Sequence, residues 1–311
     1  MFADTVHECL EEELIGKGFR TFHYTGTSRG ELKAVIGEYE GIVIRSKVRL
    51  DKDILQHAGK LKFIARAGAG MENIDVAWAE SRGILCISSP EGNRDAVGEH
   101  AIGMLLMLMN NLKRADDEVR SGIWKRAENR GYEIMGKTVG IIGYGNTGSQ
   151  FARKLSGFDA ELLVYDKYKT GFGGAHVKES SMEEIFERAD IVSLHIPLTE
   201  ETRYLVDEKF IASFHKAFYL VNTSRGPNVK TAALVQGLGS GKVRGACLDV
   251  IEYESVSFEK LGEEDLPENF RYLLNAGNVI LTPHIAGWTH ESNRKMSEVL
   301  AKKITAAFTA E

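Results

Sequence analysis

The sequence predicts an α/β protein made of two domains with doubly wound parallel sheets. Short apolar runs rich in β-branched residues alternate with helical patterns along the chain, which is typical of βαβ units. The chain has 311 residues, more than one ordinary hydrophobic core holds. Near its middle, a glycine-rich turn joins a buried strand to a helix.

The first third of the chain has the pattern of a small parallel α/β domain. Residues 1–3 are interpreted as the end of a strand, and the sequence leaves open whether that strand is short or begins before residue 1. Further strands are expected at 21–24, 41–45, 63–66 and 84–88, and helices at 6–17, 30–38, 51–58 and 73–82.

A domain boundary is expected at Pro90-Glu91-Gly92-Asn93. One long helix is predicted after it, from Val97 to Val119, and the first half of this helix is almost entirely apolar. A helix that is apolar on most faces must be covered on more than one side. We therefore expect the Val97–Val119 region to pack in the core and to form a homodimer interface.

The central unit of the chain is a strand, turn, helix and strand between residues 137 and 166. Its turn fits G-x-G-x-x-G, with Gly143 for the tight turn, Gly145 for close approach of a pyrophosphate, and Gly148 for helix–strand packing. The helix start offers free N–H groups and a positive dipole end to phosphates. Asp166 ends the second strand, about 20 residues on, where a carboxylate binds ribose hydroxyls. Together these features predict dinucleotide binding rather than a structural turn.

The dinucleotide is predicted to be NAD. The Asp166 carboxylate would repel the 2′-phosphate of NADP, although Lys167 and Lys169 follow closely and would soften that preference.

The rest of the chain continues the alternation. A capping box at Ser181 and Glu184 is expected to open a helix that ends at 188. Strands are expected at 191–196, 217–222, 245–250 and 278–281, and a last helix at 291–308. In an open parallel sheet ligands bind beyond the carboxyl ends of the strands, where this sequence places Asp166, His195, the 223–226 turn, Asp249 and His284.

Four polar residues near these strand ends are candidates for chemistry. Arg225 could hold an α-keto carboxylate with its planar guanidinium, but an ordinary surface arginine is equally compatible with its position. His284, between Pro283 and Gly287, could exchange a proton near neutral pH, although a histidine there is more often structural. Glu254 could orient that imidazole, and Asp249 could accept the nicotinamide carboxamide N–H.

Composition narrows the class of protein further. The net charge of −5 argues against nucleic-acid binding, and the longest apolar stretch, 101–109, is too short to span a bilayer. The three cysteines are far apart, with no spacing typical of a metal site or a disulfide framework, so a reducing cytoplasm is expected.

Six motifs in order resemble the D-isomer-specific 2-hydroxyacid dehydrogenases over essentially the whole chain. They lie at 66–70, 143–148 with Asp166, 194–199, 222–226, 248–254 and 282–287. The resemblance implies two Rossmann-like domains: a discontinuous substrate domain of 1–93 and 283–311, and an NAD-binding domain of 94–282, with His284 at the hinge.

The resemblance also implies roles for residues. Arg225 would polarise the keto oxygen and hold the carboxylate, with His284 as acid/base and Glu254 as its orienting partner. The cofactor would be bound by Gly143, Gly145, Asn146, Thr147, Gly148, Asp166, His195, Pro197, Thr223 and Asp249, although His195 could equally be a packing residue. The substrate would be bound by Arg45, Ser46, Arg66 and the amides of Ala69 and Gly70.

Within this family, the cations at Arg45, Lys47 and Arg66 resemble those of the D-3-phosphoglycerate dehydrogenases. Trp288 departs from the small residues of that branch and would reshape the pocket. Phosphoglycerate is the favoured substrate. The second hypothesis is a glyoxylate or hydroxypyruvate reductase, and the third is a lactate-type enzyme. An NADH-sensing scaffold of the corepressor type is the alternative from another class.

Overall fold

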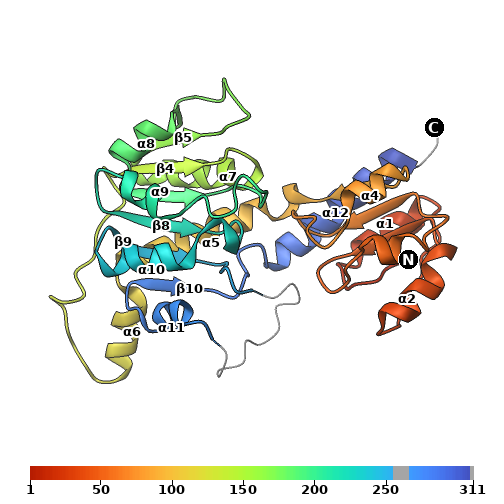
Figure 1. The fold of residues 1–311 in the computed structure, drawn as a ribbon, viewed down its shortest axis with the longest axis horizontal. Helices are drawn as coiled ribbons and strands as arrows, with labels where there is room; N and C mark the ends of the chain where they lie inside the picture. Colours follow the sequence, from red (N-terminus) through yellow and green to blue (C-terminus); the bar gives the residue numbers. More distant parts are fainter. Residues whose placement is uncertain (255–265, 309–311) are drawn as a thin grey trace. The chain divides into compact units, whose positions relative to one another are not determined.

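The computed structural model describes residues 1–254 and 266–308, which form two compact units. Unit 1 contains residues 1–94 and 288–311, and unit 2 contains 95–287. Each unit has a parallel sheet with helices beside it, so the predicted α/β class with parallel sheets is confirmed (Figure 1).

The chain passes between the two compact units after Arg94 and after Gly287, beside the domain boundaries expected after 93 and 282. The first falls inside helix α5 (Pro90–Met109), so residues 90–93 form the first turn of a helix rather than a linker. Proline suits that place because its missing N–H would have no helical partner there. The second boundary follows Gly287 instead of 282, because the N–H groups of Ile285 and Ala286 donate to Asp249 of unit 2.

Unit 1 has a three-stranded parallel sheet in the order β1-β2-β3. Its strands are β1 (Gly41–Ile44), β2 (Phe63–Arg66) and β3 (Leu85–Ser88). Its helices are α1 (Cys9–Gly16), α2 (Arg29–Val35), α3 (Lys52–Leu55), α4 (Val76–Ser81) and α12 (His290–Phe308), with a 3₁₀ turn, η1 (Ile36–Glu38).

The strands expected at 1–3 and 21–24 are reduced to single bridges. Phe2 pairs in parallel with His23 and with Val43 of β1, and neither segment extends into a strand. Side chains of β1 alternate between two apolar clusters: Ile42 and Ile44 pack with α2 and α3, and Val43 packs with α1 and α12. Helices therefore cover both faces of this small sheet.

Unit 2 has a seven-stranded sheet in the order β10-β9-β8-β7-β4-β5-β6, and every pair in it is parallel. Its strands are β4 (Thr138–Ile142), β5 (Glu161–Tyr165), β6 (Lys178–Glu179), β7 (Ile191–Leu194), β8 (Phe218–Asn222), β9 (Val243–Leu248) and β10 (Val279–Leu281). Its helices after α5 are α6 (Leu112–Arg120), α7 (Asn146–Leu155), α8 (Met182–Arg188), α9 (Glu208–Ser213), α10 (Thr231–Gly239) and α11 (Glu268–Asn275), with 3₁₀ turns η2 (Ser156–Phe158) and η3 (Gly226–Asn228). The sequence reasoning missed β6, α9, α10 and α11.

Alternating side chains fill the core on both faces of this sheet. On β4, Val139 and Ile141 pack with α5 and α7, and Ile142 faces α9 and α10. This two-residue period buries the sheet on both sides, as a doubly wound fold requires.

The long helix predicted from Val97 to Val119 is wrong: the structure has two helices. α5 begins at Pro90 and ends at Met109, and α6 begins at Leu112. Asn111 between them has a φ of 53°, a left-handed conformation that asparagine tolerates better than most residues. The break turns the chain and leaves Leu112 and Val119 exposed.

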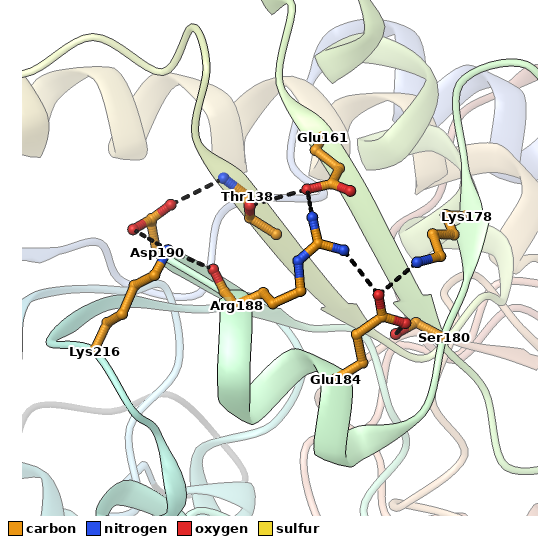
Figure 2. A network of polar contacts seen from close by, with 8 residues as sticks. All are labelled: Thr138, Glu161, Lys178, Ser180, Glu184, Arg188, Asp190 and Lys216. Atoms are coloured by element: carbon orange, nitrogen blue, oxygen red, sulfur yellow. Dashed lines mark hydrogen bonds and ion pairs between the residues drawn. The ribbon is translucent and has the colours of Figure 1, made fainter.

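The capping box predicted at Ser181 forms only in part. The Ser181 hydroxyl accepts the Glu184 N–H at 3.2 Å, but the Glu184 carboxylate turns to Lys178 and Arg188 instead (Figure 2). Arg188 also reaches Glu161 at the start of β5. This network of ion pairs lies at the amino ends of the strands, away from the edge where ligands bind in such sheets.

Candidate active site

Three neighbouring strands of unit 2 bring the predicted catalytic residues to one edge of the sheet. Backbone hydrogen bonds continue past the strand ends: the Asp249 N–H donates to Asn222 O at 3.0 Å, and the His284 N–H donates to Asp249 O at 2.8 Å. Asp249 and His284 therefore lie side by side just beyond β9 and β10. Arg225 follows the neighbouring strand β8 by three residues.

The structure pairs His284 with Glu254, as the sequence predicts. His284 Nδ1 lies 2.8 Å from Glu254 Oε2, and the second carboxylate oxygen accepts the Ile251 N–H. Both side chains are partly buried, at 30% and 22% exposure, so water screens the pair only in part. A carboxylate at Nδ1 holds that nitrogen protonated, so proton exchange with a substrate takes place at Nε2.

The backbone at His284 has a φ of 56°, in the left-handed region. A non-glycine residue held there is strained, and such strain is common where a side chain must be aimed at a ligand. The strain is held in place by Asp249, whose main-chain carbonyl accepts the His284 N–H.

Arg225 is fixed by the turn that follows β8. Its carbonyl accepts a hydrogen bond from Asn222 Nδ2 at 3.0 Å, and its guanidinium donates to Ser224 O at 2.7 Å. Gly226 lies against the backbone of Ile251, because a Cβ at that glycine would meet the Ile251 carbonyl oxygen at 1.9 Å. The arginine turn thus packs on the turn that carries Glu254.

The carboxylate of Asp249 is tied to the histidine turn. It is 1% exposed and accepts the Thr282 hydroxyl at 2.6 Å, the Ile285 N–H at 2.8 Å and the Ala286 N–H at 2.9 Å. These bonds on both sides of His284 make Asp249 a support for the histidine. Its expected contact with the nicotinamide carboxamide remains a prediction.

Two further members of this network were missed from the sequence. His100 of α5 lies 3.0 Å from the Thr282 hydroxyl and 3.5 Å from Asp249 Oδ1 through Nε2. A signal was available, because His100 directly precedes the apolar stretch 101–109 and Thr282 directly follows β10.

The glycine-rich turn has the geometry that a dinucleotide requires. Gly143 has a φ of 95°, and a Cβ there would meet His195 O at 2.4 Å. A Cβ at Gly148 would meet Gly143 O at 2.0 Å, whereas a Cβ at Gly145 would meet nothing within 4 Å. Helix α7 starts at Asn146 with no side-chain cap, so the first N–H groups, including those of Asn146 and Thr147, are open to a pyrophosphate.

Asp166 is held rigidly at the end of β5. Its carboxylate accepts the backbone N–H groups of Tyr144 at 2.7 Å, Tyr168 at 2.9 Å and Lys169 at 3.0 Å. The two nearby cations are engaged elsewhere: Lys169 Nζ donates to Tyr144 O, and Lys167 pairs with Glu201, which raises the pKa of Lys167.

His195 is buried beneath the glycine-rich turn. Its ring lies 3.2 Å from the Thr147 hydroxyl and 2.9 Å from the Ser193 hydroxyl, and burial lowers its pKa to about 3. A buried ring of this kind supports the turn from below, and its expected contact with the cofactor remains a prediction.

The other two predicted cofactor residues lie beyond β7 and β8. Pro197 O accepts the Thr202 hydroxyl at 2.7 Å. The Thr223 hydroxyl is buried with no hydrogen-bond partner within residues 1–254 and 266–308. An orphaned polar atom at the ligand-binding edge of the sheet is consistent with a partner supplied by the cofactor.

The predicted substrate residues of unit 1 follow β1 and β2. Asp4 accepts three consecutive backbone N–H groups, those of Arg45, Ser46 and Lys47, at 3.1, 2.8 and 3.0 Å. The sequence reasoning missed Asp4, although an aspartate after the first apolar residues was a signal for such a bond.

Arg66 and the turn after it complete the set in unit 1. Arg66 Nε donates to Arg45 O at 3.2 Å, and its guanidinium lies against Gly68. Within the described part of the chain, the partly exposed N–H groups of Ala69 and Gly70 have no hydrogen-bond partner. Two adjacent open N–H groups are suited to a carboxylate.

Comparison with known proteins identifies the family. Residues 102–286 match the family described as D-isomer specific 2-hydroxyacid dehydrogenase, NAD binding domain. The chain belongs to the D-2-hydroxyacid dehydrogenases. It is an NAD-dependent oxidoreductase, and the predicted family, fold and cofactor are confirmed.

Relatives within this dehydrogenase family differ in substrate. A hydroxypyruvate reductase of Thermotoga maritima is 35% identical over 276 residues, which cover 89% of this chain and 87% of the relative. A D-3-phosphoglycerate dehydrogenase of Archaeoglobus fulgidus is also 35% identical, over 96% of this chain but only 56% of the relative. The crystal structure of an Aquifex aeolicus D-lactate dehydrogenase with NAD and lactic acid has a TM-score of 0.82 and 30% identity, covering 98% and 94% of the two chains.

Across the described residues of the dehydrogenase, every helix is too short or too polar to cross a membrane.

Proposed function

We propose that this dehydrogenase interconverts D-3-phosphoglycerate and 3-phosphohydroxypyruvate. In reduction, the Arg225 guanidinium binds the 2-keto carboxylate and polarises the keto oxygen. His284 donates the proton from Nε2 to that oxygen, and Glu254 stabilises the ring through Nδ1. Bound NADH supplies the hydride to the keto carbon. In oxidation His284 acts as the base.

The substrate proposal is based on the burial and the hydrogen bonding of the Arg45 guanidinium. Its guanidinium is partly buried and makes no hydrogen bond to any residue within 1–254 and 266–308. A partly desolvated cation without an acceptor is costly unless a ligand supplies one. A phosphate on the substrate is such an acceptor, while Ala69 and Gly70 would receive the carboxylate.

A hydroxypyruvate or glyoxylate reductase is the second candidate. The Asp4 carboxylate already occupies the backbone N–H groups of residues 45–47, so these amides cannot also bind a phosphate. The relative from Thermotoga maritima, named a hydroxypyruvate reductase, is covered over most of its length. A lactate-type substrate ranks third, and an NADH-sensing scaffold would show no turnover at all.

The test is the substrate preference of Arg45→Ala beside the wild-type protein. We expect the substitution to raise KM for 3-phosphohydroxypyruvate by roughly 10- to 100-fold. This is the decrease in affinity that follows when one or two charge-assisted hydrogen bonds are lost. KM for glyoxylate should change less than about twofold, because glyoxylate has no second anion for Arg45 to bind. Equal changes for the two substrates would reject the phosphate assignment.

We also propose that the protein is a homodimer. The region from α5 to residue 135 exposes large apolar side chains, namely Met107, Leu112, Val119, Ile123, Trp124, Tyr132 and Met135. Large exposed apolar side chains that recur along one segment are often covered by a partner chain. Analytical ultracentrifugation tests this: a Leu112→Glu variant should sediment as a monomer, and a wild-type monomer at micromolar concentration would reject it. With three free cysteines, a reducing cytoplasm is the compartment we propose.

A further inference from the structure

Trp288 of unit 1 stacks on Arg45. The guanidinium carbon lies 4.0 Å from the centre of the indole ring, and both residues belong to the same compact unit. A second arginine–tryptophan pair in this unit, Arg82 on Trp78, is looser, at 5.6 Å. Trp288 as a residue is 62% exposed, so packing in the core does not explain its position.

The backbone of Arg45 is fixed independently of its side chain. Its N–H donates to Asp4, and its carbonyl accepts hydrogen bonds from Arg66 Nε and Asn73 Nδ2. The guanidinium makes no hydrogen bond within the described ranges, and its burial lowers the pKa of Arg45. In the described residues the Arg45 guanidinium thus lies over the Trp288 ring, and the negative charge of Asp4 also acts on it.

A guanidinium has two chemically distinct surfaces. Its flat face interacts with an aromatic ring, and its N–H groups point outward in its own plane. With its central carbon 4.0 Å from the centre of the Trp288 ring, the Arg45 guanidinium can contact the ring through one face and keep its N–H groups available for an acceptor. Because the ring restrains a flexible side chain before the ligand binds, less conformational entropy is lost on binding.

We infer that Trp288 is a specificity-determining positioning residue, which holds the Arg45 guanidinium ready for a second anionic group on the substrate. The inference rests on the proposed function, since it assumes a substrate with a negative charge besides its 2-keto carboxylate. It assigns a role to the bulky ring that departs from the small residue expected at this position. In this proposal Trp288 acts on the substrate through Arg45.

The experiment compares 3-phosphohydroxypyruvate with hydroxypyruvate, which share a carbon skeleton and differ by the phosphate. Kinetics are measured for the wild-type protein, Trp288→Ala, Trp288→Phe, and Trp78→Phe as the matched control from the looser stack. Trp288→Ala should raise KM for the phosphorylated substrate about 2- to 30-fold, the range of a cation–π contact, with kcat nearly unchanged. KM for hydroxypyruvate should stay within twofold. Trp288→Phe should restore most of the preference, and Trp78→Phe should not alter it.

The same data separate failure of this inference from failure of the substrate assignment. If the wild-type protein prefers the phosphorylated substrate and Trp288→Ala leaves that preference unchanged, or raises both KM values equally, the inference is overturned while the assignment stands. If the wild-type protein shows no preference, both are overturned and the dehydrogenase family remains. In an Arg45→Ala background, Trp288→Ala should have no further effect on KM; an undiminished effect would also overturn the inference.

Discussion

Replacing Glu254 by glutamine tests the orienting role of the carboxylate at His284. The carboxylate accepts two hydrogen bonds: Oε2 accepts one from the His284 ring at 2.8 Å, and Oε1 accepts one from the Ile251 N–H. The glutamine side chain has nearly the same shape but only one acceptor oxygen. One of the two donors would therefore face an NH₂ group, and the bond to the imidazolium formed in catalysis would lose its charge assistance.

The size of the effect follows from those bonds. A hydrogen bond to a charged group contributes about 1.5–3 kcal/mol and a neutral one about 0.5–1.5, so the expected loss is roughly 1–2 kcal/mol. This corresponds to a decrease in kcat of about 5- to 30-fold. The assay is steady-state NADH oxidation with a 2-keto acid, and the NADH dissociation constant, followed by fluorescence, should remain unchanged.

A double-mutant cycle makes the test specific. His284→Ala alone should lower kcat by about 10²- to 10⁴-fold, the usual contribution of a general acid. In that background Glu254→Gln should cost less than twofold, because the ring that Glu254 serves is absent. If Glu254→Gln had a nearly normal kcat, or if the two losses were simply additive, the orienting role would be refuted.

Three other predictions concern separate parts of the second unit. Arg225→Ala should abolish turnover while NADH binding persists, as measured by kinetics and fluorescence titration; loss of cofactor binding instead would reject its role at the substrate. Asp166→Ala should raise kcat/KM for NADPH relative to NADH, since the repelling carboxylate is removed, and an unchanged ratio would contradict this. Hydrogen bonds from Lys178 and Arg188 lower the pKa of Glu184 from 4.5 to about 2, so its charge stabilises the fold above pH 4.5 and this contribution is lost as pH falls towards 2. Thermal unfolding should show Glu184→Gln less stable by up to about 1 kcal/mol at pH 7, with the difference vanishing in acid; a constant difference would count against it.

Features that depend on residues close together in the sequence could be predicted from local patterns. The G-x-G-x-x-G turn, β4 and Asp166 are close along the chain, and the structure shows the tight backbone contacts that require glycine at Gly143 and Gly148. The break at Asn111 was missed, because residues 112–120 also form a helix and only the left-handed backbone at Asn111 reveals the turn. Helices α9 to α11 were missed because they have 6, 9 and 8 residues, too few for a clear helical period in the sequence.

Contacts between distant residues were harder to predict. Glu254 and Glu252 could not be separated by residue type, and the structure separates them: Glu254 binds His284, while Glu252 binds the Tyr204 hydroxyl and the Thr231 N–H. The stacking of Arg45 on Trp288 joins residues from opposite ends of the chain, and no local pattern signals it. The support of the His284 turn by Asp249 likewise depends on the order of β9 and β10.

The most direct test of the account is the rate of NADH oxidation by the wild-type protein and by His284→Ala, with a panel of 2-keto acids and chiral analysis of the product. We predict that the wild-type protein turns over at least one phosphorylated or hydroxylated 2-keto acid to the D-isomer, and that His284→Ala binds NADH normally but turns over at least a hundredfold more slowly. Tight NADH binding by the wild-type protein without turnover of any 2-keto acid would contradict the central claim, which is that His284, paired with Glu254, transfers the proton in the reaction. An undiminished rate in the variant would contradict it as well.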